Sequence, residues 1–190
     1  MNPLVKHLFD FLAGMLTKQR LAEAGAGPDA LKGAMTTMVE LPTFGEAPGR
    51  WEFRARAAIV SFMRDQLGKQ YQLGTEVKPG HEDETTTWDC SECTEAAYRT
   101  AGMSLCDGAD AQYHATQAIN NPLDGDLGFL WSDKRGMIGH VMVCTGEGTV
   151  IHAVGGRGVV EDPLHQWDGH VRWRGWRRHI DFARPPEDRA

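Results

Sequence analysis

The chain has 190 residues, of which 41% are hydrophobic and 24% are charged. This length suits one domain with a sizeable core, and this composition excludes a largely disordered chain. Twenty basic against twenty-six acidic residues give a net charge of −6, which argues against nonspecific nucleic-acid binding as the main task.

The N-terminal segment predicts helices rather than an export signal. Apolar residues recur over Leu4–Leu16 with a helical period, and a second short helix is expected over Pro28–Val39. Lys6 and Asp10 interrupt the apolar run that a secretory signal peptide needs. No window approaches the roughly 20 apolar residues of a membrane-spanning helix. We therefore expect cytoplasmic synthesis without a signal peptide and no contact with a membrane.

A domain boundary is predicted near residue 50, because two prolines and two glycines fall between residues 41 and 49. The expected organisation is a helical N-terminal arm and linker at residues 1–50, a folded domain at 51–182 and a flexible tail at 183–190. Within the domain, one helix is predicted at Trp51–Leu67, followed by Gly68 as a stop signal.

The segment that leads into the second half of the domain predicts another helix, over Trp88–Gly102. Either Asp89 or Ser91 can cap its N-terminus, and Gly102 can end it. Short β-rich runs separated by glycine turns follow, at Leu127–Trp131, His140–Cys144, Thr149–Val154, Gly158–Val160 and Val171–Ile180. Helices first and strands afterwards predict an α+β fold, with N-terminal helices followed by an antiparallel β-sheet.

Cys90 stands at the start of the second predicted helix. A thiol is a good nucleophile only as a thiolate, and the free N–H groups and dipole of a helix N-terminus stabilise that anion. The chain has four cysteines, too few for a dense disulfide framework, and cytoplasmic synthesis favours reduced thiols. A free cysteine is most often a small buried hydrophobe, so this position alone does not establish catalysis.

Two histidines lie in a predicted β-hairpin over residues 138–153, His140 on one strand and His152 on the other. A three-residue loop at 146–148 would set position 142 opposite 152 and put both histidines on one face, roughly 7–8 Å apart at Cα. A two-residue loop would put them on opposite faces, and the residues leave both registers open. With Cys90 they can supply the nucleophile, base and orienting group of thiol acyl transfer.

The same residues are compatible with two other kinds of site. Cys90 and Cys93 form a C-x-x-C pattern that is typical of redox pairs in another setting, but no β-α-β pattern surrounds them here. Cys90, His140 and His152 are also a chemically reasonable zinc ligand set with an open position for water.

Five short motifs occur in one order along the chain: Tyr71–Gly74, Asp89–Ser91, Gly125–Phe129, His140–Val141 and Ile151–Ala153. In these motifs and their spacing the chain resembles the NlpC-type cell-wall cysteine peptidases, which have a papain-like fold. The resemblance covers about residues 55–180. Each motif is weak alone, but five in register are quite specific.

The resemblance implies a role for each matching residue. Cys90 would be the nucleophile, His140 the base and His152 the third polar group, with Tyr71 near the oxyanion or substrate carbonyl. Asp89 and Ser91 would help to bind the peptide. The expected activity is hydrolysis of peptidoglycan stem peptides, mostly at γ-D-glutamyl bonds, through a thioester acyl-enzyme that needs no metal or cofactor.

The chain departs from the family pattern at Glu92, where a small residue usually follows Asp-Cys-Ser. Its carboxylate would repel an anionic stem residue if it lined the cleft, so Glu92 is predicted either to alter substrate binding or to face solvent. This residue keeps an amidase or acyltransferase on the same scaffold open as an alternative.

A further alternative is a non-catalytic structural component of a phage tail or assembly. The expected setting is a phage lysin or tail-associated peptidase, virion-associated or released to the cell wall. The N-terminal arm would then dock to other tail or lysis proteins.

Overall fold

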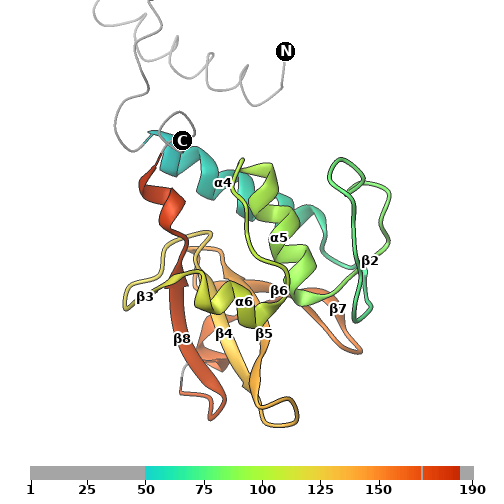
Figure 1. Cartoon of the computed structure of the whole chain (residues 1–190), viewed down its shortest axis with the longest axis vertical. Coiled ribbons are helices and arrows are strands. Elements are labelled where there is room, and N and C mark those ends of the chain that lie inside the picture. Colours follow the sequence, from blue (N-terminus) through green and yellow to red (C-terminus); the bar gives the residue numbers. More distant parts are fainter. Residues whose placement is uncertain (1–49, 168, 185–190) are drawn as a thin grey trace, which may run out of the picture. The chain divides into compact units, whose positions relative to one another are not determined.

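The computed structural model describes residues 50–167 and 169–184. The helices predicted before residue 50 and the tail from residue 185 lie outside the described residues, and the domain boundaries stay a prediction. Within the described part of the chain, helices come first and antiparallel strands follow, which confirms the α+β prediction (Figure 1). None of the described helices is long and apolar enough to span a bilayer.

The described part of the chain has three α-helices. They are α4 (Arg50–Asp65), α5 (Cys90–Thr100) and α6 (Ala109–His114). In α4 the buried residues Ala55, Ile59 and Met63 recur every fourth position, so they form one stripe that faces the core. The sequence did not predict α6, because a helix of six residues is too short to show a periodic pattern.

Six strands form one antiparallel sheet in the order β3-β8-β4-β5-β6-β7. They are β3 (Gln117–Ile119), β4 (Leu127–Ser132), β5 (Met137–Cys144), β6 (Thr149–Val154), β7 (Gly158–Pro163) and β8 (Trp173–Arg178). A parallel pair, β1 (Gln70–Tyr71) and β2 (Thr87–Trp88), precedes α5, and two 3-10 turns, η2 (Leu164–Gln166) and η3 (Ile180–Ala183), flank β8. The predicted strands correspond to β4 through β8, but β7 continues to Pro163 instead of ending at Val160.

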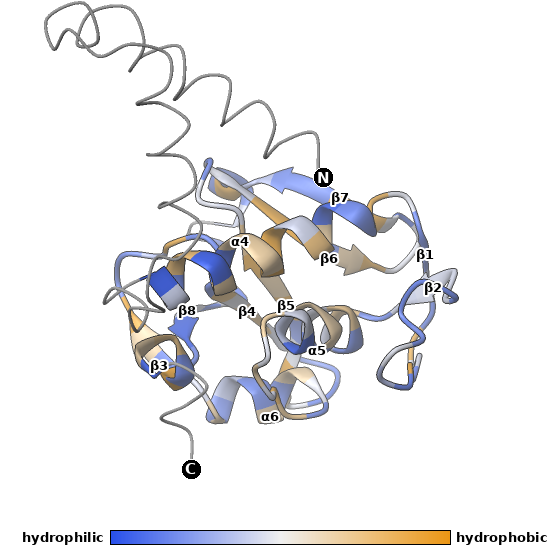
Figure 2. Ribbon diagram, turned by 90° about the horizontal axis from the view of Figure 1, so that it is seen from above, coloured by the Kyte–Doolittle hydropathy of each residue, from blue (hydrophilic) through white to orange (hydrophobic). Residues whose placement is uncertain are grey.

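The main core lies between the helices and the sheet. Helix α5 contacts α4 on one side and β5 and β6 on the other. Strand β6 is buried along most of its length, and Figure 2 shows it as strongly hydrophobic, whereas the end of the edge strand β7 is hydrophilic. The hydrophobic effect therefore fixes α5 against the middle of the sheet, which decides where the residues at its N-terminus lie.

A buried ion-pair cluster ties the two ends of the domain together at Asp126. This carboxylate accepts hydrogen bonds from Arg56 of α4, at 3.1 Å, and from Arg178 of β8, at 2.6 Å. The Tyr98 hydroxyl of α5 donates to the neighbouring Gly125 carbonyl at 2.6 Å. Since buried charges are tolerated only when paired, this cluster holds both helices and β8 at the turn that enters β4.

The strand that carries His140 contains a β-bulge. Trp131 of β4 pairs with Ile138, while the preceding residue of β4 pairs with His140, so Gly139 is an extra residue in β5. A Cβ atom at position 139 would lie 2.4 Å from the Cβ of Ser132. The close approach of the two strands therefore requires glycine immediately before His140.

Candidate active site

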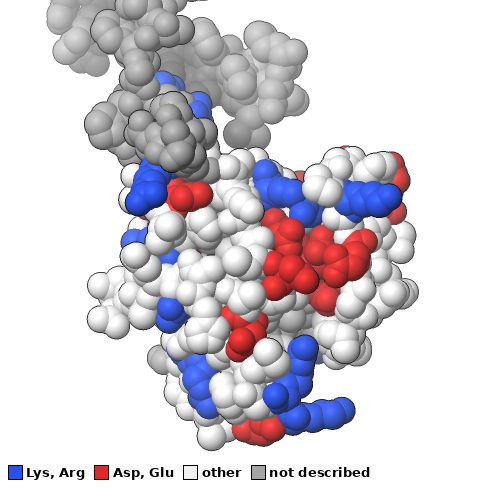
Figure 3. All heavy atoms as spheres, viewed as in Figure 1, with Lys and Arg blue, Asp and Glu red and all other residues white. Residues whose placement is uncertain are grey.

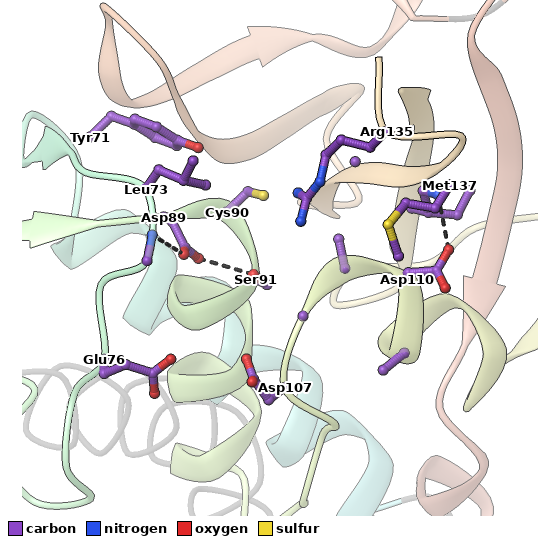
Figure 4. A pocket seen from close by; sticks show the side chains of 16 residues that line it. Tyr71, Leu73, Glu76, Asp89, Cys90, Ser91, Asp107, Asp110, Arg135 and Met137 are labelled. Carbon is purple, nitrogen blue, oxygen red and sulfur yellow. Dashed lines mark hydrogen bonds between the residues drawn. The ribbon is translucent and has the colours of Figure 1, made fainter. Parts of the chain in front are cut away.

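A cleft of about 500 Å³ opens at the N-terminus of α5 (Figure 4). Its walls come from the segment after β1, the first residues of α5, the loop before α6 and the β4–β5 hairpin. The predicted site residues Tyr71, Asp89, Cys90 and Ser91 all line it. These four residues therefore lie together in one wall of the cleft, and their roles stay predictions.

Cys90 is the first residue of α5 and is almost fully buried. Burial raises the pKa of its thiol to about 11, and the backbone N–H of Val141 acts in the opposite direction. The thiol is therefore protonated at neutral pH and needs a base before it can attack.

Cys90 lies against β5 at the place where β5 separates from β6. These two strands pair only at Val143–Ile151 and Cys144–Val150. Beyond that point the backbone N–H of Val141 is close enough to the Cys90 sulfur to lower its pKa. The helix N-terminus therefore meets the sheet one residue away from His140.

His140 and His152 lie on the neighbouring strands β5 and β6 and are hydrogen-bonded to each other. The pairing of β5 with β6 extrapolates to 142 opposite 152, which confirms the three-residue loop. The Nε2 atom of His140 is 2.8 Å from the Nδ1 atom of His152. Burial, reinforced by His152, lowers the pKa of His140 to about 3. Since its imidazole is neutral near pH 7, it is in the form that accepts a proton.

No hydrogen bond joins the His140 ring to the Cys90 sulfur within the described residues. Contacts between a nucleophile and its base are often loose in a substrate-free site and tighten when substrate binds. The His140 ring and the Cys90 thiol must therefore come within hydrogen-bond distance before proton transfer.

Asp162 is a member of the site that sequence reasoning missed. Its Oδ2 atom is 3.0 Å from the Nε2 atom of His152, and Arg157 binds the same carboxylate through both of its terminal nitrogens. The sequence predicts that the strand ends at Val160, which would place Asp162 in a loop, whereas β7 continues to Pro163. An aspartate two residues beyond a strand end, in phase with the strand, is the signal that would have revealed it.

Asp89 and Ser91 line the cleft, but the Asp89 carboxylate is already engaged. Its Oδ1 atom accepts from the Glu92 N–H at 2.8 Å and from the Ser91 hydroxyl at 3.0 Å, and Oδ2 accepts from the Gly74 N–H at 3.0 Å. Asp89 thus caps α5 and holds the loop after β1. Asp89 therefore stabilises the part of the cleft wall that lies beside Cys90.

Tyr71 projects from β1 into the cleft on the same side as Cys90 (Figure 4). Burial raises the pKa of its hydroxyl, the charges of Cys90 and Asp89 add to the effect, and Arg135 opposes it. The hydroxyl therefore keeps its proton at neutral pH and can donate a hydrogen bond to a bound carbonyl.

Glu92 does not line the cleft, contrary to one of the two placements predicted for it, nor does it face solvent. Its side chain is buried, and it accepts hydrogen bonds from the Val77 N–H at 3.2 Å and from Arg99 at 3.3 Å. Arg99 also pairs with Glu82 and Glu95, and Figure 3 shows acidic side chains gathered on this face. The physical reason is the acidic loop, which folds over α5 and encloses Glu92.

Arg135 is a second residue that the sequence did not single out. It belongs to the turn between β4 and β5, and its guanidinium points into the cleft (Figure 4). Within residues 50–167 and 169–184 no hydrogen bond or ion pair engages its side chain. The cleft therefore offers a cation to an anionic group of a ligand.

The possible metal set is used differently in this structure. Among the described residues no three His, Cys, Asp or Glu side chains are arranged to hold a metal ion. His140 and His152 direct facing ring nitrogens at each other, and His152 directs its second nitrogen at Asp162. Both ring nitrogens of His152 are therefore engaged in hydrogen bonds, and neither is available as a zinc ligand in this geometry.

Comparison with known proteins adds a sequence match over most of this site. The model described as "NlpC/P60 family" matches residues 68–178. The chain is 34% identical over 109 residues to the "Probable endopeptidase p60" of Listeria monocytogenes, and 33% identical over 110 residues to the protein of the same name from Listeria innocua. The matches cover 56% and 57% of this chain but only 20% and 21% of those proteins.

Solved structures show the same fold. An NLP/P60-family protein from Staphylococcus aureus, described as similar to lipoprotein, is 27% identical with a TM-score of 0.56, over 67% of this chain and 42% of that one. The peptidoglycan hydrolase RipB of Mycobacterium tuberculosis is 20% identical with a TM-score of 0.55, over 87% and 92%. At that identity the second likeness concerns the fold alone.

Proposed function

The chain belongs to the NlpC/P60 family, and from this membership we propose that it is a cysteine peptidase that hydrolyses the stem peptides of bacterial peptidoglycan. The Listeria relatives are named as probable endopeptidases and RipB as a peptidoglycan hydrolase. Because the chain matches only about a fifth of the Listeria proteins, their activity is carried over here as a proposal and not as an inherited property.

One observation carries the proposal: the thiol at the start of α5 lines the cleft close to the strand that carries His140, whose ring is hydrogen-bonded to His152. Cys90 lies against Val141, and His140 is the residue before it. The chain thus brings a helix-terminal thiol and a neutral imidazole to adjacent positions, as nucleophilic acyl transfer requires.

The proposed reaction has two halves. His140 takes the proton of the Cys90 thiol as the sulfur attacks the carbonyl carbon of the stem amide. The C–N bond then breaks, and the imidazolium returns the proton to the leaving amine, which leaves a thioester on Cys90. Water, deprotonated by His140, hydrolyses this thioester and regenerates the thiol.

The walls of the cleft support this course. The Tyr71 hydroxyl and the N–H groups at the start of α5 are donors beside the sulfur. Donors of this kind stabilise the negative charge that develops on the carbonyl oxygen. Asp89 and Ser91 form the adjacent wall, where we place the part of the stem that precedes the scissile bond.

We assign the bond to the γ-carboxyl side of D-glutamate. A γ-linked glutamate keeps its α-carboxylate free, and Arg135 is a cation in the cleft with which that group can pair. The earlier reason to favour an amidase or acyltransferase was repulsion by Glu92, and that reason is gone because Glu92 lies outside the cleft. Delivery by a phage tail or as a free lysin stays a prediction.

The test uses purified peptidoglycan and the full chain. We expect release of new amines with time, and mass spectrometry of the soluble fragments should show stems that end at D-glutamate. Cys90→Ala should abolish the release, whereas Cys106→Ser, at an exposed cysteine, should retain it. Fragments from the wild type with a different terminus would reject the bond assignment, and equal release by Cys90→Ala would reject the thiol mechanism.

A further inference from the structure

Asp162 lies on β7, the neighbour of the strand β6 that carries His152. Its position along β7 brings its carboxylate within reach of the His152 ring. In the β6–β7 ladder Asp162 pairs with Val150 and His152 pairs with Val160. Residues two positions apart on a strand share a face, so Asp162 and His152 are diagonal neighbours. The hydrogen bond of 3.0 Å between them therefore follows from the register of the sheet.

The carboxylate of Asp162 can only accept hydrogen bonds near neutral pH. Arg157 binds it at 2.6 and 2.8 Å. Chiefly through this bond, and with a further contribution from His152, the pKa of Asp162 is lowered to about 2 although burial acts in the opposite direction. An ionised carboxylate has no proton to donate. The facing Nε2 atom of His152 must therefore carry the hydrogen of this bond.

The position of this hydrogen on His152 also determines the hydrogen bond between His152 and His140. Burial lowers the pKa of His152, so its ring is neutral and has one N–H only. With that hydrogen on Nε2, its Nδ1 atom is an acceptor, and the Nε2 atom of His140, 2.8 Å away, must be the donor. The neutral ring of His140 then has its lone pair on Nδ1.

We propose that Asp162 is a positioning residue of this site, which fixes the tautomers of His152 and His140 so that Nδ1 of His140 is free to take the proton from Cys90. The proposal rests on the peptidase function proposed above. Asp162 does not touch the substrate; it acts through two rings. Once His140 is protonated, its ring is positively charged. The two hydrogen bonds through His152 then link this imidazolium to the Asp162 carboxylate, whose negative charge stabilises it.

Packing supports this role by limiting the movement of the middle ring. Trp167 packs edge-on against His152, with ring centroids 5.3 Å apart and an interplanar angle of 83°, and the His152 side chain has no exposed surface. A ring enclosed in this way cannot flip to exchange its two nitrogens without displacing Trp167. The tautomer is therefore decided by the partner at each nitrogen.

The first test reads the tautomers directly and needs no variant and no activity. Nitrogen-15 NMR of the histidine side chains near pH 7 separates protonated from bare ring nitrogens. We expect hydrogen on Nε2 of both His140 and His152. Hydrogen on Nδ1 of His152 in the wild-type protein would overturn the proposal, whatever the protein hydrolyses.

The second test is Asp162→Asn, which keeps the shape but can also present an N–H to His152. We expect mixed tautomers of both rings and a fall in kcat of at least about tenfold, with KM changed by less than about twofold. Asp162→Glu, which restores an acceptor-only group, should recover part of the loss. Glu161→Gln is the matched control, because Glu161 is the adjacent residue and is exposed.

Arg157→Gln distinguishes a role of Asp162 in positioning His152 from a purely structural role as the partner of Arg157. It removes the partner of the carboxylate but leaves the Asp162–His152 bond, so the tautomers should persist and kcat should fall less than in Asp162→Asn. Equal losses in both variants with unchanged tautomers would mean that Asp162 only anchors Arg157, and would overturn the proposal. If the wild type hydrolyses no stem peptide, the proposed function fails, and the NMR result still decides the tautomer assignment.

Discussion

The two halves of the active site are held in place by different means. On the sheet, His140, His152 and Asp162 are linked side chain to side chain across three neighbouring strands. On the helix, Cys90 is held by the backbone and by the Asp89 cap, which also binds the loop at Gly74. The base half is thus set mainly by strand register, whereas the nucleophile half depends on a loop that forms one wall of the cleft.

The largest effect that can test this comparison is the loss of activity at extremes of pH. Burial lowers the pKa of His140 to about 3 and raises that of Cys90 to about 11. Activity should fall as the pH drops through the His140 pKa, because the base is then occupied by a proton. It should also fall above the Cys90 pKa, because no proton remains for the leaving amine.

The measurement is kcat/KM on a soluble stem peptide over a wide pH range, with circular dichroism to exclude unfolding. We expect the acid limb below the ordinary histidine pKa of about 6.5 and the alkaline limb above the ordinary cysteine pKa of about 8.5. An acid limb at or above the ordinary histidine pKa would mean that the His140 ring is exposed to water in the free enzyme, so that burial does not lower its pKa.

The next effect concerns the nucleophile half. Asp89→Ala removes the N-cap of α5 and the bond to Gly74, so it should lower the free energy of unfolding by about 1–2 kcal/mol and kcat/KM by about tenfold. Urea denaturation and hydrolysis assays check the two parts. Asp107→Ala, at an exposed residue across the cleft, is the control and should leave stability unchanged. A stable, fully active Asp89→Ala would show that the loop does not support Cys90.

A smaller effect is expected from Arg135, which belongs to neither half. Arg135→Gln should raise KM about fivefold on stems with a free D-glutamate carboxylate, because a solvent-exposed ion pair is worth at most about 1 kcal/mol. Amidated stems should be unaffected, and added salt should shrink the difference. Lys134→Gln, one residue earlier in the same turn, is the matched control. Equal effects on both stems would remove Arg135 from substrate recognition.

The smallest effect is expected at Glu92, which fastens the loop to α5. Burial raises the pKa of Glu92, and the charge of Glu95 adds to this. The ionised form is therefore disfavoured in the folded protein, a cost that is present above the folded pKa and disappears as the pH falls through it. Glu92→Gln removes this cost together with the Arg99 pair, so the free energy of unfolding should change by less than about 1 kcal/mol near pH 7.

Urea denaturation at several pH values checks this balance. The wild type should gain stability relative to Glu92→Gln as the pH falls toward the ordinary glutamate pKa. The ratio of activities on free and amidated stems should stay the same, and a changed ratio would return Glu92 to the cleft.

The sequence predicted the parts of the site that local pattern controls. The helix start located Cys90, and the predicted hairpin put His140 and His152 on neighbouring strands. The residues did not decide between the two loop lengths, and the structure has the register of the three-residue loop. Asp162 was missed because an acidic pair before Pro163 looks like a strand end. Its place depends on a third strand that the local pattern does not reveal. Glu92 was misplaced for a similar reason, since the loop that buries it folds back through non-local contacts.

The bulge at Gly139 has a consequence for how this protein tolerates change. A single added methyl group there would meet Ser132 at 2.4 Å, and either strand would have to move. Any such movement would displace the next residue, which is the proposed base. In a library of random substitutions we therefore expect position 139 to accept no replacement in active clones, although a glycine supplies no side chain to the reaction. The nearby turn residue Lys134, which is exposed to solvent, should vary freely.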